Sequence, residues 1–110
     1  MQLRDYLCVP YLLEAQSVEV SPGEWVIRLR YPELPDCSAE SLSLEEGLRL
    51  LDRRRIQTII TLLQRGESPP VPRQPLAACD PIWLAEEAGL PAETIALIEC
   101  NEFGLKIPPA

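Results

Sequence analysis

The sequence predicts an α+β fold, in which a small antiparallel sheet of about three strands packs against one long helix and a short helical pair follows. Three observations predict it. Apolar and polar residues alternate over residues 18–31, apolar residues recur every three or four positions over residues 44–63, and residues 66–77 contain four prolines. With 46% apolar residues, the 110-residue chain can form a hydrophobic core. We therefore divide it into a core (1–66), a proline-rich linker (67–77) and a C-terminal appendage (78–110).

The N-terminal part is predicted to form two strands joined by a turn. Residues 21–24, Ser-Pro-Gly-Glu, suit a type II turn, because proline presets the second position and glycine tolerates the positive φ of the third. Arg28 and Arg30 should project from the face opposite the apolar one. The segment 7–15 could begin the first strand, with Pro10 at an edge or a kink. The apolar residues that alternate with polar neighbours are Val18 and Val20 in the first strand and Trp25, Ile27, Leu29 and Tyr31 in the second.

The stretch YPELPDCSAES, residues 31–41, predicts a strand end, a tight return and a short third strand. Pro32 and Pro35 each remove a backbone donor and push the preceding residue toward extended geometry, so the second strand should end near Tyr31. Asp36 turns the chain, and residues 37–41 then run back as the third strand.

A long helix is predicted over residues 43–65. Ser43 is its expected N-cap and Glu46 completes a Ser-x-x-Glu capping box, while Gly66 fits the C-terminal cap. Arg53–Arg55 form its most basic patch, which is either a solvated face or a contact to phosphate or to an acidic partner. One buried stripe is expected, formed by Leu44, Leu48, Leu51, Ile56, Ile59, Ile60 and Leu63. The proline-rich residues 66–77 then form a stiff linker or a strap over the surface.

Composition disfavours several classes of function. Seventeen acids against ten bases give a net charge of −7, which discourages nonspecific binding to nucleic acid or anionic membrane and suits a basic partner. The chain has no histidine, no Gly-x-Ser-x-Gly and no phosphate-binding glycine loop, so we expect no enzyme, no cofactor and no metal site. No apolar run could span a bilayer and the N-terminus lacks a signal-peptide layout, so we expect a cytoplasmic protein. Its four cysteines are then interpreted as buried thiols.

These motifs, in this order, resemble the HicB-like antitoxin family from about Val9 to Leu76. Family members run from a β-hairpin through a Pro-acid-Leu-Pro-Gly-Cys turn to a Thr-Leu-x-Glu-Ala-Leu helix start, and their long helix ends near Gly-x-x-Ile-Pro-x-Pro. Here residues 32–37 read PELPDC, residues 43–48 read SLEEGL and residues 66–72 read GESPPVP. Asp36 and Gly47 depart from the family's usual glycine and alanine. Asp36 can still enter a left-handed turn. Gly47 costs roughly 1 kcal/mol of helix propensity relative to alanine, unless close packing requires a glycine there.

The resemblance implies a partial RNase H-like core without nuclease chemistry. It also implies that the protein binds and neutralises a small basic toxin of the HicA type, an RNA-cleaving protein. The family motifs do not define the contact residues, so charge complementarity alone suggests Glu33, Glu40 and Glu45 as partner-binding residues. We also expect a homodimer. The alternatives are a structural or adaptor subunit of a larger assembly, or a DNA-binding autorepressor that acts through residues 83–99.

Residues 83–99 resemble the middle of a repressor-type helix-turn-helix, with Leu-Ala-x-x-x-Gly-Leu followed by Thr-Ile-x-x-Ile-Glu. Charge argues against DNA binding, because residues 76–110 carry Lys106 as their one base against six acids. The presumptive recognition helix presents Ala92, Glu93 and Ala96 where bases or amides would face the groove. We therefore expect the pair to serve packing, dimerisation or protein contact. The sequence leaves open whether Trp83 anchors this segment or faces a partner, and whether residues 103–110 are ordered.

Overall fold

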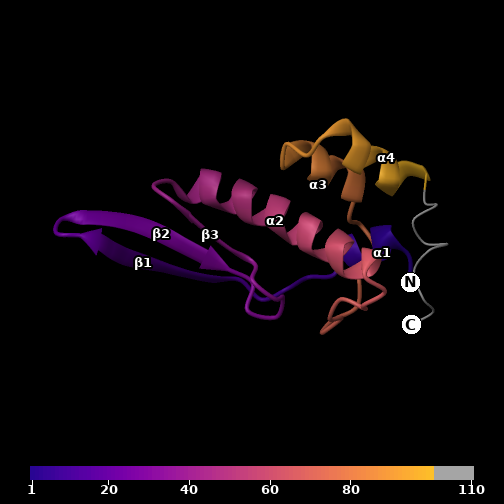
Figure 1. The fold of residues 1–110 in the computed structure, drawn as a ribbon, viewed down its shortest axis with the longest axis horizontal. Helices are drawn as coiled ribbons and strands as arrows, with labels where there is room; N and C mark the ends of the chain where they lie inside the picture. Colours follow the sequence, from indigo (N-terminus) through magenta and orange to yellow (C-terminus); the bar gives the residue numbers. More distant parts are fainter. Residues whose placement is uncertain (101–110) are drawn as a thin grey trace.

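The computed structural model describes residues 1–100 and has an α+β fold, as the sequence predicts (Figure 1). Residues 103–110, whose order the sequence leaves open, lie outside the described residues. The elements in chain order are α1 (Leu3–Leu7), β1 (Glu14–Ser21), β2 (Glu24–Arg30), β3 (Ser38–Ser41), α2 (Leu44–Gln64), α3 (Pro81–Glu87) and α4 (Ala92–Cys100).

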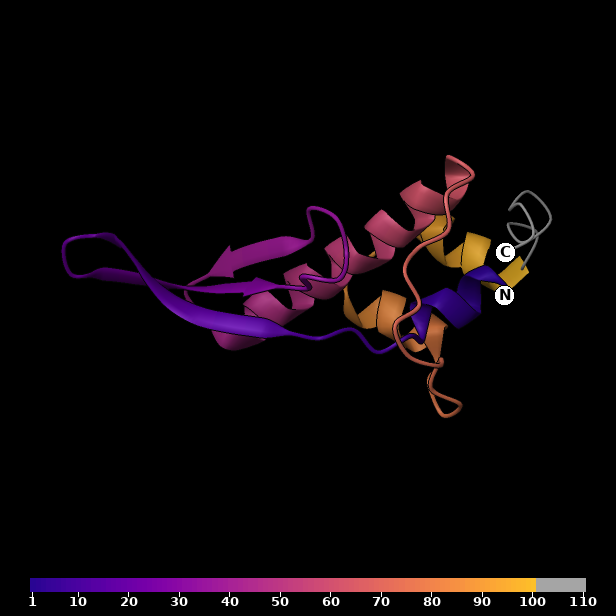
Figure 2. The ribbon, with the colours of Figure 1, turned by 90° about the horizontal axis from the view of Figure 1, so that it is seen from below.

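The elements form three layers. The antiparallel sheet, in the order β1-β2-β3, lies on one side of α2, and α3 and α4 lie on the other side (Figure 1). The short helix α1 packs near the C-terminal end of α2. The molecule is elongated, 51 × 26 × 26 Å, because the β1–β2 hairpin projects beyond the N-terminal end of α2 (Figures 1 and 2). A large part of the hairpin therefore has no helix over it.

The alternating apolar residues of the two strands lie on different faces of the hairpin. Val18 pairs with Val26, so it lies on the face of Arg28 and Arg30, and only the other face meets α2. On that helix-facing side Leu29 is fully buried, but Trp25, four residue pairs closer to the hairpin tip, is 56% exposed. The physical reason is the projection of the hairpin, since α2 covers only the end that carries Leu29.

The N-terminal segment also differs from the prediction. Residues 7–15 were expected to begin the first strand, but the strand starts at Glu14 and residues 3–7 form α1. Leu3, Tyr6 and Leu7 are all buried in the core. Their i, i+3, i+4 spacing is that of a helix face, and it places the three side chains together against the C-terminal half of α2.

The predicted turns and helix ends are confirmed, with one change at the N-cap. Gly23 and Asp36 take the positive φ values, 80° and 50°, that their turns require. The Ser43 side chain accepts a hydrogen bond from the Glu46 amide at 3.1 Å. The Ser43 amide, however, donates to the Ser41 hydroxyl rather than to Glu46, so the two serines share the capping.

Helix α2 ends in a Schellman motif around Gly66, which has a φ of 77°. The Gly66 amide donates to the Leu63 carbonyl at 3.0 Å and the Glu67 amide donates to the Leu62 carbonyl at 2.9 Å. A left-handed conformation favours glycine at this position, so the sequence signal and the geometry agree.

The stripe of α2 that faces the sheet is mostly as predicted, except at its N-terminal end. Leu51 and Ile59 are fully buried. Leu44 is 50% exposed, because it lies at the N-terminal end of α2, where the hairpin extends beyond the helix. A Cβ added to Gly47 would lie 2.8 Å from Leu29 Cδ1. The departure from the alanine of the HicB-like pattern therefore allows a close approach between α2 and β2.

The proline-rich residues 66–77 form a strap that is attached to the core. Tyr11 donates its hydroxyl proton to the Pro70 carbonyl at 2.8 Å, and Arg73 pairs with Glu33 at 2.9 Å. Farther along, the Leu76 amide donates to the Cys8 carbonyl. Of the two possibilities that the sequence left open, a free linker and a strap, the structure has the strap.

Candidate partner-binding surface

The three arginines of the patch on α2 differ in exposure, since Arg54 is exposed, Arg53 is half-buried and Arg55 is buried. Arg53 Nε donates to the Ala88 carbonyl at 2.9 Å, and Arg54 donates to the Ser38 carbonyl. Arg55 is only 6% exposed. The prediction of a solvated face is therefore wrong for Arg55, while Arg54 is exposed as a solvated face requires, and all three side chains join α2 to neighbouring elements.

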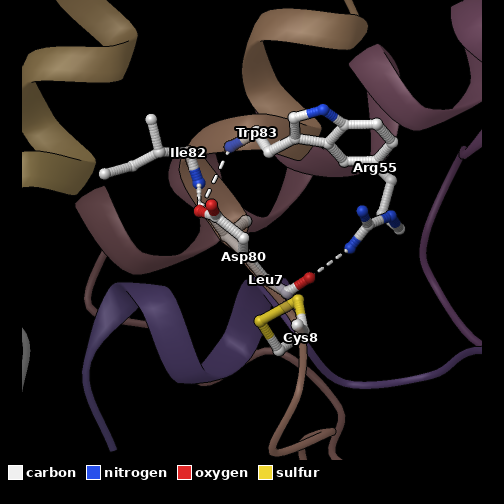
Figure 3. Close-up of a disulfide and its surroundings, with 7 residues drawn as sticks. Leu7, Cys8, Arg55, Asp80, Ile82 and Trp83 are labelled. Atoms are coloured by element: carbon white, nitrogen blue, oxygen red, sulfur yellow. Dashed lines mark hydrogen bonds between the residues drawn. A yellow bond between two sulfur atoms is a disulfide. The ribbon is translucent and has the colours of Figure 1, made fainter.

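Arg55 is the most enclosed of the three. It donates to the Leu7 carbonyl at 2.8 Å, next to the disulfide drawn in Figure 3, and its Nε lies 3.5 Å from the Asp52 carboxylate. Asp52 also accepts the hydroxyl proton of Tyr31 at 3.0 Å. Burial raises the pKa of Tyr31, and the Asp52 carboxylate adds to the shift. The guanidinium is therefore paired inside the protein and is not offered to a ligand.

The cysteine prediction is wrong for Cys8 and Cys79, which form a disulfide with a Cα–Cα distance of 5.7 Å. The bond links the end of α1 to the start of the α3–α4 segment (Figure 3). Beside it Asp80 caps α3 by accepting hydrogen bonds from the amides of Ile82 and Trp83. Cys37 agrees with the prediction, since it is a buried free thiol whose pKa is raised to about 11 by burial.

The three glutamates suggested as partner contacts lie on different parts of the fold. Glu33, in the turn after β2, accepts hydrogen bonds from Arg73 and from the Leu12 amide, which hold its pKa below the usual range. Glu40 pairs with Arg28 at 3.1 Å on the outer face of the sheet. Glu45 is exposed in the first turn of α2. The structure does not bring them together, and their role in partner binding stays a prediction.

The charges that remain outward are mainly negative. Within residues 1–100, the arginines whose side chains form no hydrogen bond and no ion pair are Arg4, Arg49 and Arg65. A larger set of exposed acids has no ion-pair partner in the same part of the chain: Glu19, Glu24, Asp36, Glu45, Glu46, Glu67, Asp80, Glu86, Glu87, Glu93 and Glu99. The positive side chains thus hold the fold together while the carboxylates face solvent.

An apolar shelf, which we define as Trp25, Leu42 and Leu44, lies where the hairpin projects past α2. These side chains are 56%, 83% and 50% exposed. Sequence periodicity assigned Trp25 and Leu44 to buried faces, and it missed their exposure because periodicity identifies a face without showing how far a neighbouring element covers it. Large exposed apolar groups that lie together mark sites of protein contact.

Trp83, at the other side of α2, does not anchor the appendage by burial, since it is 57% exposed. It lines a groove of about 230 Å³ between α2 and α3, together with Glu45, Arg49 and Glu87 among others. The first turn of α2 therefore lies between two partly apolar surface features, the shelf and this groove.

The helices α3 and α4 have the predicted helix-turn-helix arrangement, with Gly89 at a φ of 73° in the turn. Ala85, Leu90 and Ile98 are buried and pack the pair together and against the core. The exposed positions of α4 include Ala92, Glu93, Ala96 and Glu99. This face offers small side chains and carboxylates, and no base for a phosphate.

Residues 1–100 contain no group of three or more histidine, cysteine or acidic side chains that could hold a metal ion. No helix in the same range has both the length and the apolar character needed to cross a membrane. Comparisons of the chain with models of protein families, with curated proteins and with solved structures find no match.

Proposed function

We propose that the chain is a HicB-like antitoxin, a non-enzymatic protein that binds and neutralises a small basic RNA-cleaving toxin of the HicA type. The proposal includes a partial RNase H-like core, a homodimeric state and a cytoplasmic location, where the Cys8 and Cys79 thiols would be reduced for most of the time. It is supported by the order of its parts, because a hairpin, a proline-flanked turn, a third strand and a long capped helix follow one another as the resemblance implies.

The observation that carries the proposal is the distribution of charge. Arg53, Arg54 and Arg55 are turned to backbone carbonyls of the protein, and Arg28, Arg30 and Arg73 pair with its own glutamates. The exposed carboxylates then dominate the surface field. Such a field attracts a basic protein at long range and repels nucleic acid. A toxin that holds RNA must carry a basic surface, and this chain is complementary to it.

The same observation ranks the alternatives. Autorepression through α4 would require cations at the phosphates, but the exposed Glu93 and Glu99 oppose such contacts. An adaptor role is favoured by one feature, the packing of the acidic helical pair on α2 opposite the sheet, which leaves the face of α4 free for a larger assembly (Figure 1). We rank this role second, since it explains the appendage but not the resemblance over residues 9–76.

The antitoxin proposal implies a short reading frame for a basic protein next to that of this chain, and growth of cells that express this adjacent reading frame tests the proposal. That protein alone should arrest growth, and co-expression of this chain should restore it. A charge-reversed variant, Glu45→Arg with Glu46→Arg, should restore growth less well, because it removes the acids at the exposed start of α2. The matched control is Arg4→Glu with Arg65→Glu, which also changes two exposed charges but increases the acidity. Unchanged arrest in the presence of the wild-type chain contradicts the proposal.

A further inference from the structure

The apolar shelf lies at the open end of the layer between the sheet and α2. Ile27 on β2 is paired with Ser41 on β3, and the strands are antiparallel. Trp25 is two residues beyond Ile27 toward the hairpin tip, so it lies about 7 Å past that pair and level with Ser43, where β3 has ended. The Trp25 ring thus stands beside the connection from β3 to α2.

Leu44 approaches the same place from the helix. It is three residues before Gly47 and seven before Leu51, both buried against the sheet, so it lies on the sheet-facing side of α2. Trp25 is on the helix-facing side of β2, because it shares that side with Ile27 and Leu29. The two side chains therefore border one opening, and the exposed Leu42 lies in the connection between them.

The hairpin extends the opening into a ledge. Its tip projects past the start of α2 in both views of the fold (Figures 1 and 2). Within residues 1–100 no element covers Trp25, Leu42 or Leu44, whose exposed fractions are 56%, 83% and 50%. The apolar residues on the facing sides of β2 and α2 thus end in Trp25 and Leu44, which are exposed to solvent.

Carboxylates flank the shelf and identify the chemistry of its occupant. Glu19 is the residue opposite Trp25 on β1, and Glu45 and Glu46 follow Leu44 in the chain, with Glu45 on the side of α2 that lines the groove with Trp83. None of the three has an ion-pair partner among the described residues. A second copy of the chain, docked symmetrically, would place two such sets of carboxylates face to face. A basic protein would instead pair its own charges with them.

We propose that the shelf is the docking surface for the basic partner, which inserts an apolar side chain against Trp25 and Leu44, with Leu42 at the margin, and places lysine or arginine near Glu19 and Glu46. The inference rests on the proposed function, since it names the surface that an antitoxin of this kind uses. It assigns the main apolar contact to Trp25, because a large exposed aromatic ring with acids around it has the composition of a binding hot spot.

The chain supplies a matched control for a test. Trp25 and Trp83 are equally exposed, at 56% and 57%, but lie on different elements and on opposite sides of α2. The probe is the purified HicA-type protein from the adjacent reading frame, and titration calorimetry measures its binding to full-length wild-type, Trp25→Ser and Trp83→Ser chains. Far-UV circular dichroism and urea unfolding confirm that each variant is folded.

We expect Trp25→Ser to weaken binding about tenfold or more and Trp83→Ser to change it by less than about twofold. Glu19→Gln with Glu46→Gln should reduce the salt dependence of binding. If the wild-type chain binds and Trp25→Ser binds equally well, the shelf is refuted while the proposed function stands. If the wild-type chain does not bind, both are refuted. A wild-type dimer that Trp25→Ser converts to a monomer, as seen by sedimentation, makes a second copy the occupant and also overturns the inference.

Discussion

Loss of the Cys8–Cys79 disulfide should strongly reduce the free energy of unfolding. The bond joins residues 71 positions apart, and in the loop-entropy description closing a loop of that length in the unfolded chain is worth about 4 kcal/mol at 25 °C. Domains of this size have total stabilities of about 5–15 kcal/mol, so the loss is a large fraction of the whole. The hydrogen bond between the Leu76 amide and the Cys8 carbonyl, and the Arg73–Glu33 pair, still hold the strap after reduction.

Urea unfolding followed by far-UV circular dichroism measures the effect. The oxidised wild type should unfold at the highest urea concentration, and the reduced wild type and the Cys8→Ser, Cys79→Ser double variant should unfold together at a lower one. Reductant added to the double variant is the control and should shift nothing. Equal urea midpoints for oxidised and reduced protein refute the reasoning. Mass spectrometry that finds the Cys8 and Cys79 thiols free after refolding in air also refutes it.

Three further changes test packing, burial and pH dependence. Gly47→Ala should lower the free energy of unfolding by about 1–2 kcal/mol, because the new methyl group would lie 2.8 Å from Leu29 Cδ1. The gain in helix propensity offsets only part of this strain. A variant that is more stable in urea unfolding contradicts this packing. Arg55→Ala should lower the free energy of unfolding by about 1–3 kcal/mol, mainly because the buried Leu7 carbonyl loses its donor, while the Asp52 carboxylate, whose side chain is 36% exposed, can be hydrated; an unchanged free energy of unfolding would show that this contact is not needed. The Glu33 pKa is lowered by Arg73, so its stabilising effect is present above the ordinary glutamate pKa and is lost as the pH falls through the lowered value. Glu33→Gln should remove this part of the acid dependence, and identical pH–stability curves for the two proteins would contradict the pairing.

Local signals in the sequence predicted the local structure well. Pro32 and Pro35 end the second strand, Ser43 caps the long helix and Gly66 closes it, because each effect depends on the backbone chemistry of a few neighbouring residues. The order of hairpin, turn, strand and helix followed from these signals.

Tertiary relations were not available from the same patterns. Periodicity placed Trp25 and Leu44 on core faces, but their exposure depends on how far the hairpin projects past α2. Arg55 is buried beside α1, where it donates to the Leu7 carbonyl. The sequence pattern does not predict this short helix. The pairing of Cys8 with Cys79 likewise depends on the path of the strap, which cysteine spacing does not encode.

Within the candidate surface, the acidic character was predictable from composition, while the identity of the apolar residues was not. Glu45 was suggested from charge and does lie beside the shelf in the chain, next to Leu44. Glu33 was suggested on the same grounds, but its carboxylate is engaged by Arg73 and the Leu12 amide. Net charge cannot distinguish an acid that holds the fold from one that faces a partner.

The most direct test of the central claim is a titration of RNA cleavage. The purified product of the adjacent basic reading frame is mixed with a labelled RNA, and this chain is added in increasing amounts up to a severalfold excess. The antitoxin account predicts that cleavage falls steeply and ends near a fixed stoichiometric ratio, and that high salt weakens the inhibition because acidic and basic surfaces are screened. Cleavage that continues unchanged at excess chain and low salt would contradict the account.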